Sequence, residues 1–159
     1  MANTSETAII SGIGHVALYA SDMEKTLNFY CGVLGLKHAF TLRGADGLPW
    51  IEYLKVSDDN FIELFYIKPN SQTAAVAPAT EAATPAPAPA PANNGTFHHI
   101  CLAVGDIHAA EKALDEAEGP VDVRPKQGSD KNWQMWTHDP DGVKIELMQI
   151  SPDSPQAKS

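Results

Sequence analysis

Residues 14–36 read GHVALYASDMEKTLNFYCGVLGL, and residues 98–119 read HHICLAVGDIHAAEKALDEAEG. Each stretch begins with a short apolar run typical of a strand and continues with the apolar spacing of a helix. In the first stretch, Ser21 and Glu24 have the spacing of a capping box. In the second stretch, Asp106 is the expected N-cap. The chain therefore contains the same strand–helix unit twice.

Three further strand-like segments follow each unit, separated by Gly, Asp, Pro and Ser residues typical of turns. They are residues 36–44, 49–56 and 60–67 in the first half, and residues 121–125, 132–139 and 142–150 in the second half. Each half is therefore predicted to be a βαβββ module, at residues 10–70 and 96–151. Neither module looks able to bury its sheet alone. We expect an α+β fold in which both modules form one continuous, curved, barrel-like mixed sheet with the helices outside.

Residues 71–95 separate the two modules and consist almost entirely of Ala, Pro, Thr, Ser and Asn. This composition does not repay the conformational entropy of ordering, and Ala-Pro runs favour extended polyproline conformations. We predict a disordered linker without chemistry of its own. Such a linker lets the modules pair within one chain or exchange between two chains. We expect a homodimer, because the edge strands of these sheets need cover.

The 159-residue chain has a formal net charge of −9, and its only arginines are Arg43 and Arg124. Nucleic acid and anionic membrane surfaces are therefore poor partners. The chain shows no signal-peptide pattern and no apolar run of the ~20 residues that a membrane span needs. Cys31 and Cys101 fall in a predicted helix and a predicted strand, so we expect free thiols and a cytoplasmic location.

Aligning the two halves on their strands places His15 over His99 and Glu63 over Glu146. Each glutamate lies in an apolar strand, where a carboxylate is costly unless it is paired, hydrogen-bonded or bound to a metal. Two imidazoles and two carboxylates suit one divalent ion such as Ni²⁺, Co²⁺, Zn²⁺, Fe²⁺ or Mn²⁺. Neighbouring side chains of a strand point to opposite faces, so His99 is the predicted ligand and His98 a neighbour on the other face.

Four segments together resemble the vicinal oxygen chelate superfamily, the glyoxalase I-like proteins: GHVALYASDMEKTLNFYCGVLGL, FIELF, HHICLAV and DPDGVKIEL. The resemblance covers nearly the whole chain except the linker and the two tails. It implies two βαβββ modules that enclose a metal ion. It also implies that the ligand positions of the glyoxalase I and methylmalonyl-CoA epimerase type are filled by His15, Glu63, His99 and Glu146.

The resemblance implies a divalent-metal-dependent enzyme that transfers a proton next to a metal-bound carbonyl of a small hydroxy-carbonyl substrate. It would be an isomerase, an epimerase or a glyoxalase-type lyase, with Glu146 and Glu63 as catalytic residues and Glu146 as the first candidate base. One alternative is an Fe(II) extradiol-type dioxygenase, whose two-His-one-carboxylate site would leave Glu63 unused. Another is a non-catalytic small-molecule-binding protein of the antibiotic-resistance type.

Tyr19 and Ile67 stand where the resemblance to bacterial glyoxalase I would place an arginine and an asparagine that hold glutathione. A glutathione adduct is therefore not the expected substrate. The candidate substrate-binding residues are aromatic, amide and carboxylate side chains that suit a small polyhydroxylated or keto-acid compound, with core packing as the alternative: Tyr19, Trp50, Glu52, Gln127, Trp133, Gln134 and Trp136. The remaining histidines are predicted surface or turn residues: His38, His108 and His138.

Overall fold

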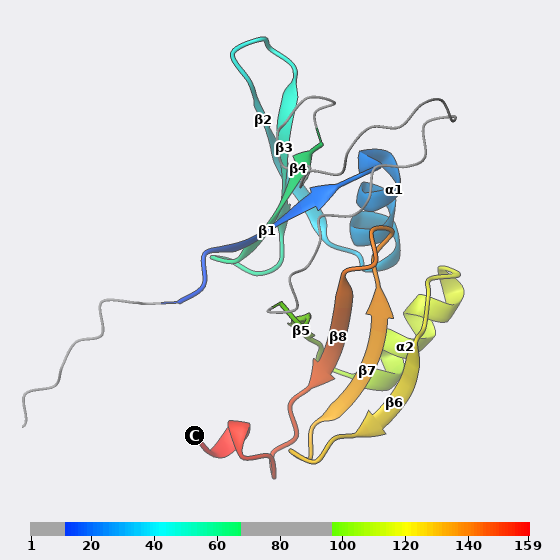
Figure 1. Cartoon of the computed structure of the whole chain (residues 1–159). Helices are drawn as coiled ribbons and strands as arrows, with labels where there is room; N and C mark the ends of the chain where they lie inside the picture. The colour runs from blue at the N-terminus through cyan, green and yellow to red at the C-terminus, as the bar shows by residue number, and fades with distance from the viewer. Residues whose placement is uncertain (1–11, 68–96) are drawn as a thin grey trace, which may run out of the picture.

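The computed structural model of the protein describes residues 12–67 and 97–159 (Figure 1). Each of the two ranges contains one four-stranded sheet and one main helical segment. The linker predicted at residues 71–95 lies outside the described residues. In the described ranges, no helix is long and apolar enough to cross a membrane.

The first module begins with a strand, a short α-helix and a π-helical continuation, and ends with three strands. These elements are β1 (His15–Ala20), α1 (Met23–Leu27), η1 (Asn28–Val33), β2 (Lys37–Arg43), β3 (Pro49–Lys55) and β4 (Phe61–Tyr66). The strand order in the sheet is β1-β4-β3-β2. Strand β1 runs parallel to β4, whereas the other neighbouring strands are antiparallel.

The second module repeats the same order of elements. They are β5 (Ile100–Ala103), α2 (Ile107–Glu116), β6 (Val123–Gln127), β7 (Trp133–His138) and β8 (Lys144–Gln149), followed by a 3-10 turn η2 (Gln156–Lys158). The strand order β5-β8-β7-β6 matches that of the first sheet, again with one parallel and two antiparallel pairs. This repetition confirms the predicted α+β fold of two βαβββ modules.

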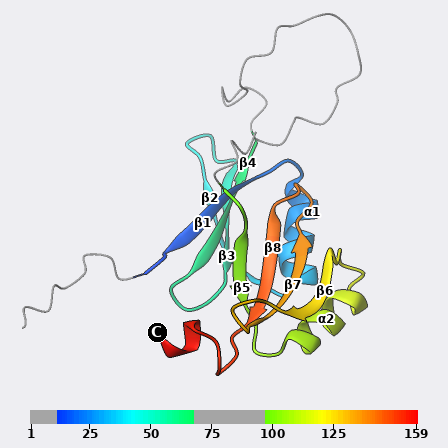
Figure 2. The same cartoon turned by 60° about the horizontal axis from the view of Figure 1, so that its bottom comes forward.

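The two sheets differ from the expectation in one respect. They are curved but separate, and within the described residues no strand of one sheet is hydrogen-bonded to a strand of the other (Figures 1 and 2). The edge strands are β1 and β2 in the first sheet and β5 and β6 in the second. The modules meet instead through side chains on the helix-bearing faces, because burying apolar area there requires no pairing of backbone edges.

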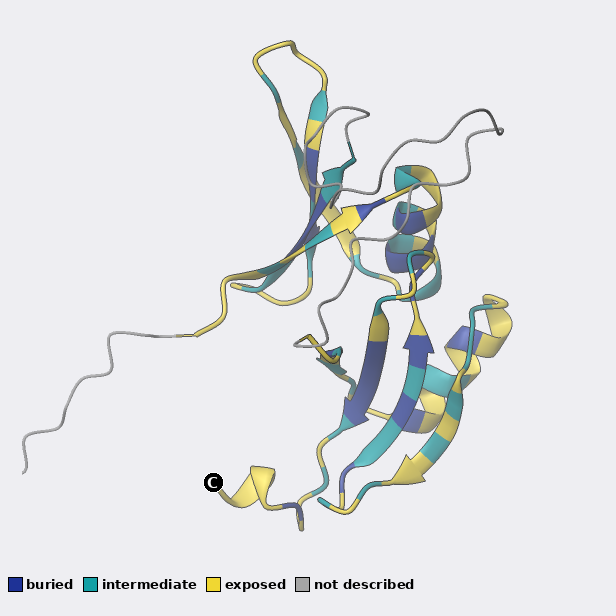
Figure 3. Ribbon diagram, viewed as in Figure 1, coloured by how far each residue is buried: buried dark blue, intermediate teal, exposed yellow. Residues whose placement is uncertain are grey.

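A single buried cluster contains residues of both modules. It consists of Phe29, Tyr30, Leu54, Ile62, Leu64, Ile107, Leu114, Met135, Ile145 and Leu147. Two polar contacts reinforce this junction: the Tyr30 hydroxyl donates to Asp139 Oδ2 (3.1 Å), and the Ser21 amide donates to Asp141 Oδ2 (3.1 Å). Figure 3 shows the resulting asymmetry, since β8 is almost fully buried whereas β2 is exposed along most of its length.

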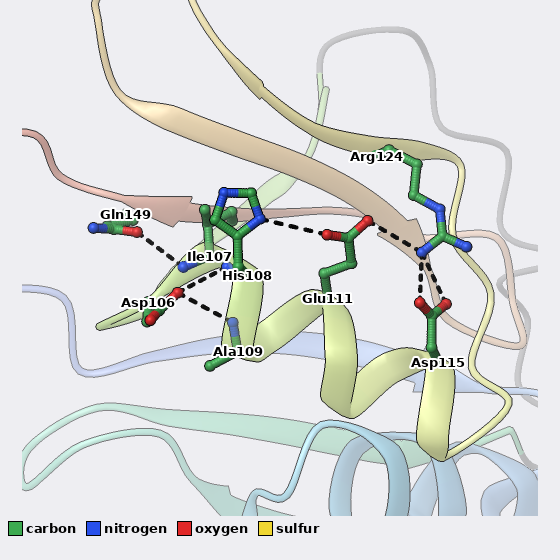
Figure 4. A network of polar contacts seen from close by, with 8 residues as sticks. All are labelled: Asp106, Ile107, His108, Ala109, Glu111, Asp115, Arg124 and Gln149. Atoms are coloured by element: carbon green, nitrogen blue, oxygen red, sulfur yellow. Dashed lines mark hydrogen bonds and ion pairs between the residues drawn. The ribbon is translucent and has the colours of Figure 1, made fainter.

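The helix starts confirm one capping prediction and correct the other. Asp106 caps α2 as expected, because its Oδ1 accepts hydrogen bonds from the His108 amide (2.8 Å) and the Ala109 amide (3.1 Å) (Figure 4). In α1 the N-cap is Asp22, whose Oδ1 accepts from the Lys25 amide (3.2 Å), rather than Ser21. The Ser21 amide donates to Asp141 of the other module instead. The N-cap therefore lies one residue later than the spacing predicts.

Helix α2 is also tied to its sheet at both ends. At its start, the Ile107 amide donates to Gln149 Oε1 (2.9 Å) at the end of β8. Near its end, Arg124 Nη1 on β6 donates to Asp115 Oδ2 (2.7 Å) and lies 3.2 Å from Glu111 Oε1 (Figure 4). These contacts hold α2 across the face of β6, β7 and β8. The opposite face of that sheet is thereby left open.

Candidate metal centre

The predicted ligands lie on the sheet faces that point away from the core, which we call the open faces. In β4, Ile62 and Leu64 belong to the core, so Glu63 between them points to the open face. In β8, Ile145 and Leu147 do the same for Glu146. The alternation of apolar residues therefore places both carboxylates on open faces.

The first of two His–Glu pairs, which we call the N-terminal half-site, joins β1 and β4. His15 Nδ1 lies 3.4 Å from Glu63 Oε1. The Glu63 side chain is only 8% exposed, whereas the His15 side chain is 54% exposed. Tyr53 lies directly opposite Glu63 on β3 and hydrogen-bonds to its carboxylate, and this bond raises the pKa of Tyr53. Glu63 is thus a buried carboxylate held by a phenol and an imidazole.

The second pair, the C-terminal half-site, joins the start of β5 to β8. His99 Nε2 lies 3.1 Å from Glu146 Oε2, and the two side chains are 27% and 8% exposed. Cys101, opposite Glu146 on β5, hydrogen-bonds to the carboxylate. Burial, together with the charge of Glu146, raises the pKa of Cys101 to about 12, so the thiol stays protonated as a donor. On the other side of Glu146, Trp136 of β7 packs edge-on against the His99 ring, with ring centroids 4.9 Å apart.

The chemistry of each half-site fits a divalent metal ion. Among the described residues, neither Glu63 nor Glu146 has a lysine or arginine within ion-pair distance. A buried carboxylate without a cation is costly, and a bound ion removes that cost. Ligand bonds of ~2.0–2.2 Å place adjacent donor atoms ~3.0–3.5 Å apart. The nitrogen–oxygen separations of 3.4 Å and 3.1 Å match two adjacent ligand positions.

The two half-sites do not form a single cluster in one chain. Within residues 12–67 and 97–159, no group of three or more His, Cys, Asp or Glu side chains is arranged so that it could hold a metal ion. The structure therefore brings His15 to Glu63 and His99 to Glu146, but it does not bring the two pairs together. The described part of one chain therefore has two candidate ligands at each of two places.

Aromatic rings surround the N-terminal half-site on its open face. Tyr19 and Trp50, both predicted substrate residues, pack against Phe65, with centroids 5.9 Å and 6.0 Å away. Tyr53 stacks on Phe40 at 4.3 Å. Tyr19, Trp50 and Phe40 are each more than 40% exposed in the single chain. The open face of the first sheet is therefore a largely uncovered aromatic surface.

The predicted substrate residues of the second module are distributed over both faces. Trp136 lies in the C-terminal half-site, and Gln134 precedes it on the same face of β7, where its amide lies 3.4 Å from Asp130 Oδ1. The Gln127 amide instead donates to the Lys131 carbonyl (3.2 Å) in the β6–β7 turn. Trp133 packs against the core. Of these four residues, only Gln134 and Trp136 lie on the face that carries Glu146.

Glu52 belongs to a separate cluster on the core side of the first sheet. Its carboxylate accepts hydrogen bonds from the Thr41 hydroxyl (2.6 Å) and the Tyr66 hydroxyl (2.7 Å), and it lies 2.7 Å from His38 Nε2. Burial acts to raise the pKa of Glu52, but these three bonds outweigh burial and lower it. Glu52 is therefore satisfied by its neighbours, away from both half-sites, and His38 is its partner.

Three residues of the half-sites were missed by the sequence reasoning. Cys101 and Tyr53 lie opposite the two carboxylates, and the matched strand register could have found both. The prediction that His98 points away from His99 was wrong, since the two Nδ1 atoms lie 2.6 Å apart. Both histidines precede β5, which starts at Ile100, so the strict alternation of a strand does not apply to them.

The sequence profile of the Glyoxalase/Bleomycin resistance protein/Dioxygenase superfamily matches residues 12–147. The chain belongs to this superfamily. A probable lactoylglutathione lyase of Synechocystis sp. is 31% identical over 143 residues, which cover 86% of this chain and 94% of that protein. An ethylmalonyl-CoA/methylmalonyl-CoA epimerase of Cereibacter sphaeroides is 29% identical over 146 residues, which cover 89% of this chain and all of that protein.

A solved structure shares the superfamily fold. TnmS3, an antibiotic-binding protein from Streptomyces sp. CB03234, superposes with a TM-score of 0.64 at 23% identity, covering 91% of this chain and 100% of the other. At this level of identity the match shows the fold alone. The proteins similar to this chain are thus named as a lyase, an epimerase and an antibiotic-binding protein, and a shared fold does not distinguish among these functions.

Proposed function

We propose that the protein is a divalent-metal-dependent enzyme that transfers a proton at the carbon next to the carbonyl group of a small hydroxy-carbonyl substrate. The observation that carries this proposal is the pair of buried carboxylates, Glu63 and Glu146, each beside an imidazole and without a cationic partner in the described residues. The ion would be Ni²⁺, Co²⁺, Zn²⁺, Fe²⁺ or Mn²⁺. As a Lewis acid, it would stabilise negative charge that develops on the substrate oxygen.

In this proposal the residues of the chain have distinct roles. His15 and His99 bind the ion together with the two carboxylates. Glu146 would be the general base that removes the proton from substrate carbon, and the ion would supply stabilisation of the negative charge on the substrate oxygen. Glu63 would return a proton to the substrate from the side opposite Glu146. The relatives named lyase and epimerase support this class of reaction.

We further propose that the four-ligand centre forms between two copies of the chain in a homodimer. The N-terminal half-site of one copy would then face the C-terminal half-site of the other. Two observations support this assembly: the described part of one chain contains no group of three ligands, and its open faces are exposed, with Tyr19 at 42% and Phe40 at 45%. Isologous pairing of two copies would create two equivalent centres and cover both faces.

A second candidate function is ligand binding without catalysis. The observation that favours it is the aromatic surface around Glu63, since exposed rings of this kind bind planar molecules. A binding protein would retain its ligand after metal removal, whereas the proposed enzyme would lose its reaction. Oxygen consumption would instead identify a dioxygenase.

The direct test is metal-dependent exchange of substrate protons with deuterium. Protein purified without chelator or a nickel column is analysed for metal and incubated in D₂O with hydroxyacetone or with its aromatic counterpart, 2-hydroxyacetophenone. We expect about one ion per chain, loss of exchange on chelation, and recovery on adding the ion. Glu146→Gln should slow exchange by ~10²–10⁴-fold, whereas Glu116→Gln, at an exposed position on α2, should not.

Two results would contradict the proposal. Exchange at an unchanged rate after complete removal of the metal would exclude a metal-dependent reaction. A Glu146→Gln variant that holds its full metal content and exchanges at the wild-type rate would exclude Glu146 as the base, and Glu63 would become the residue to test.

A further inference from the structure

His98 and His99 interact with each other through their rings. Their Nδ1 atoms lie 2.6 Å apart, and the ring centroids are 4.9 Å apart at an interplanar angle of 77°. An imidazole nitrogen is either a donor, when it carries hydrogen, or an acceptor. At this separation one of the two Nδ1 atoms must donate and the other must accept. The contact therefore couples the tautomers of the two rings.

The other nitrogen of His99 decides the direction of this hydrogen bond when an ion is bound. His99 Nε2 faces Glu146 Oε2 at 3.1 Å, so Nε2 is the atom that would bind an ion together with the carboxylate. A ligand nitrogen carries no hydrogen, which leaves the hydrogen of a neutral His99 on Nδ1. His99 Nδ1–H then donates to His98 Nδ1, and His98 carries its own hydrogen on Nε2.

The remaining surroundings of His99 fix the plane of its ring. Trp136 packs against it at an angle of 78°, so the imidazole is held between the rings of His98 and Trp136. His15 is different: its side chain is twice as exposed, and among the described residues no aromatic ring is stacked against it. Of the two half-sites, the C-terminal one is therefore the more rigidly organised.

We propose that His98 is a positioning residue of the metal centre. By accepting the hydrogen bond from His99 Nδ1 in the ion-bound state, it stabilises the tautomer that leaves Nε2 free and holds the ring towards Glu146. The proposal rests on the proposed function, because it concerns the affinity of the same centre. Partners of this kind, bonded to the second nitrogen of a ligand histidine, typically change metal affinity 10–100-fold when removed.

The test measures Zn²⁺ binding to the full chain by competition with a coloured chelator. His98→Phe retains a ring but cannot accept the bond, and we expect it to weaken binding by about 10–100-fold. His98→Gln supplies an amide oxygen as acceptor and should restore affinity to within a few fold of wild type. His108→Phe, the same change at an exposed position on α2, should have no effect. His98 is itself exposed, so these changes leave the core intact.

A second readout needs no variant. Long-range ¹⁵N–¹H spectra of the Zn²⁺-loaded wild-type protein should show hydrogen on Nδ1 of His99 and on Nε2 of His98. Hydrogen on Nδ1 of His98 in that state would overturn the proposal. So would wild-type affinity in His98→Phe, or equal weakening in His98→Phe and His98→Gln.

Failure of this inference is distinguishable from failure of the proposed function. If His99→Ala loses Zn²⁺ while His98→Phe retains it, the metal centre stands and the role of His98 is wrong. If His99→Ala binds Zn²⁺ like the wild type, the metal centre itself is wrong, and the positioning role falls with it.

Discussion

Three buried glutamates among the described residues are stabilised in different ways. Glu52 has three partners at 2.6–2.7 Å, from two hydroxyls and an imidazole, and needs nothing further. Glu63 and Glu146 each have one imidazole and one weakly acidic donor, and they lie on open sheet faces. Burial alone therefore does not identify a functional carboxylate. Glu63 and Glu146 have fewer hydrogen-bond partners than Glu52, and this difference distinguishes the two proposed metal ligands from the structural glutamate.

The Glu52 cluster predicts a dependence of stability on alkaline pH. Burial and the bond to Glu52 raise the pKa of Tyr66 from its ordinary 10.0 to about 12. The unfolded chain therefore loses this proton at lower pH than the folded chain. The contribution of Tyr66 to stability is fully present below pH 10 and is lost as the pH rises to about 12.

Tyr66→Phe removes this titration and tests its sign. Denaturant unfolding between pH 9 and 12 should show the wild-type free energy of unfolding falling more steeply with pH than that of the variant. Other groups titrate in both proteins and cancel in the difference. Parallel curves across this range would show that Tyr66 titrates alike in the folded and unfolded chains.

Helix starts and strand–helix units can be predicted from the sequence where they depend on residues that are close together in the chain. Asp106 predicts the start of α2, and the two strand–helix patterns predict the two modules, because capping and apolar spacing depend on neighbours in sequence. The start of α1 differs, since the amide of Ser21 bonds to Asp141, 120 residues away. The contact of His98 with His99 also escapes the pattern, because it depends on where β5 begins.

The junction of the two modules depends on a glycine between α2 and β6. A Cβ atom on Gly119 would lie 2.5 Å from Val33 Cγ1, at the end of η1 in the other module. Val33 is β-branched and cannot turn away freely. We expect Gly119→Ala to destabilise the protein by about 1–3 kcal/mol in chemical unfolding.

Truncating the opposing side chain should relieve this effect. In a Val33→Ala background the clashing atom is absent, so Gly119→Ala should cost much less there than in the wild type. A double-mutant cycle measures this difference as a coupling free energy. Strictly additive effects of the two substitutions would show that the modules do not approach each other at this point.

At the scale of the whole molecule, the modules share one core but present their half-sites separately. The repeat of βαβββ units could be predicted from the chain, because each unit carries its own strand and helix patterns. The pairing of the half-sites could not be predicted in this way. Each module contains one matched His–Glu pair, and the same sequence is compatible with pairing within one chain or between two chains. The separate sheets and the exposed aromatic face favour completion of the centre by a second copy.

Subunit complementation tests this assembly and the metal centre together. One variant carries His15→Ala and Glu63→Gln, and a second carries His99→Ala and Glu146→Gln. Neither should bind Zn²⁺ alone. If the centre forms between chains, unfolding and refolding the two variants as a mixture yields mixed dimers, each with one intact centre, and should restore about one ion per mixed dimer. A mixture that binds no more Zn²⁺ than the separate variants, beside a wild-type sample that regains its ions after the same treatment, would contradict a centre shared between two chains.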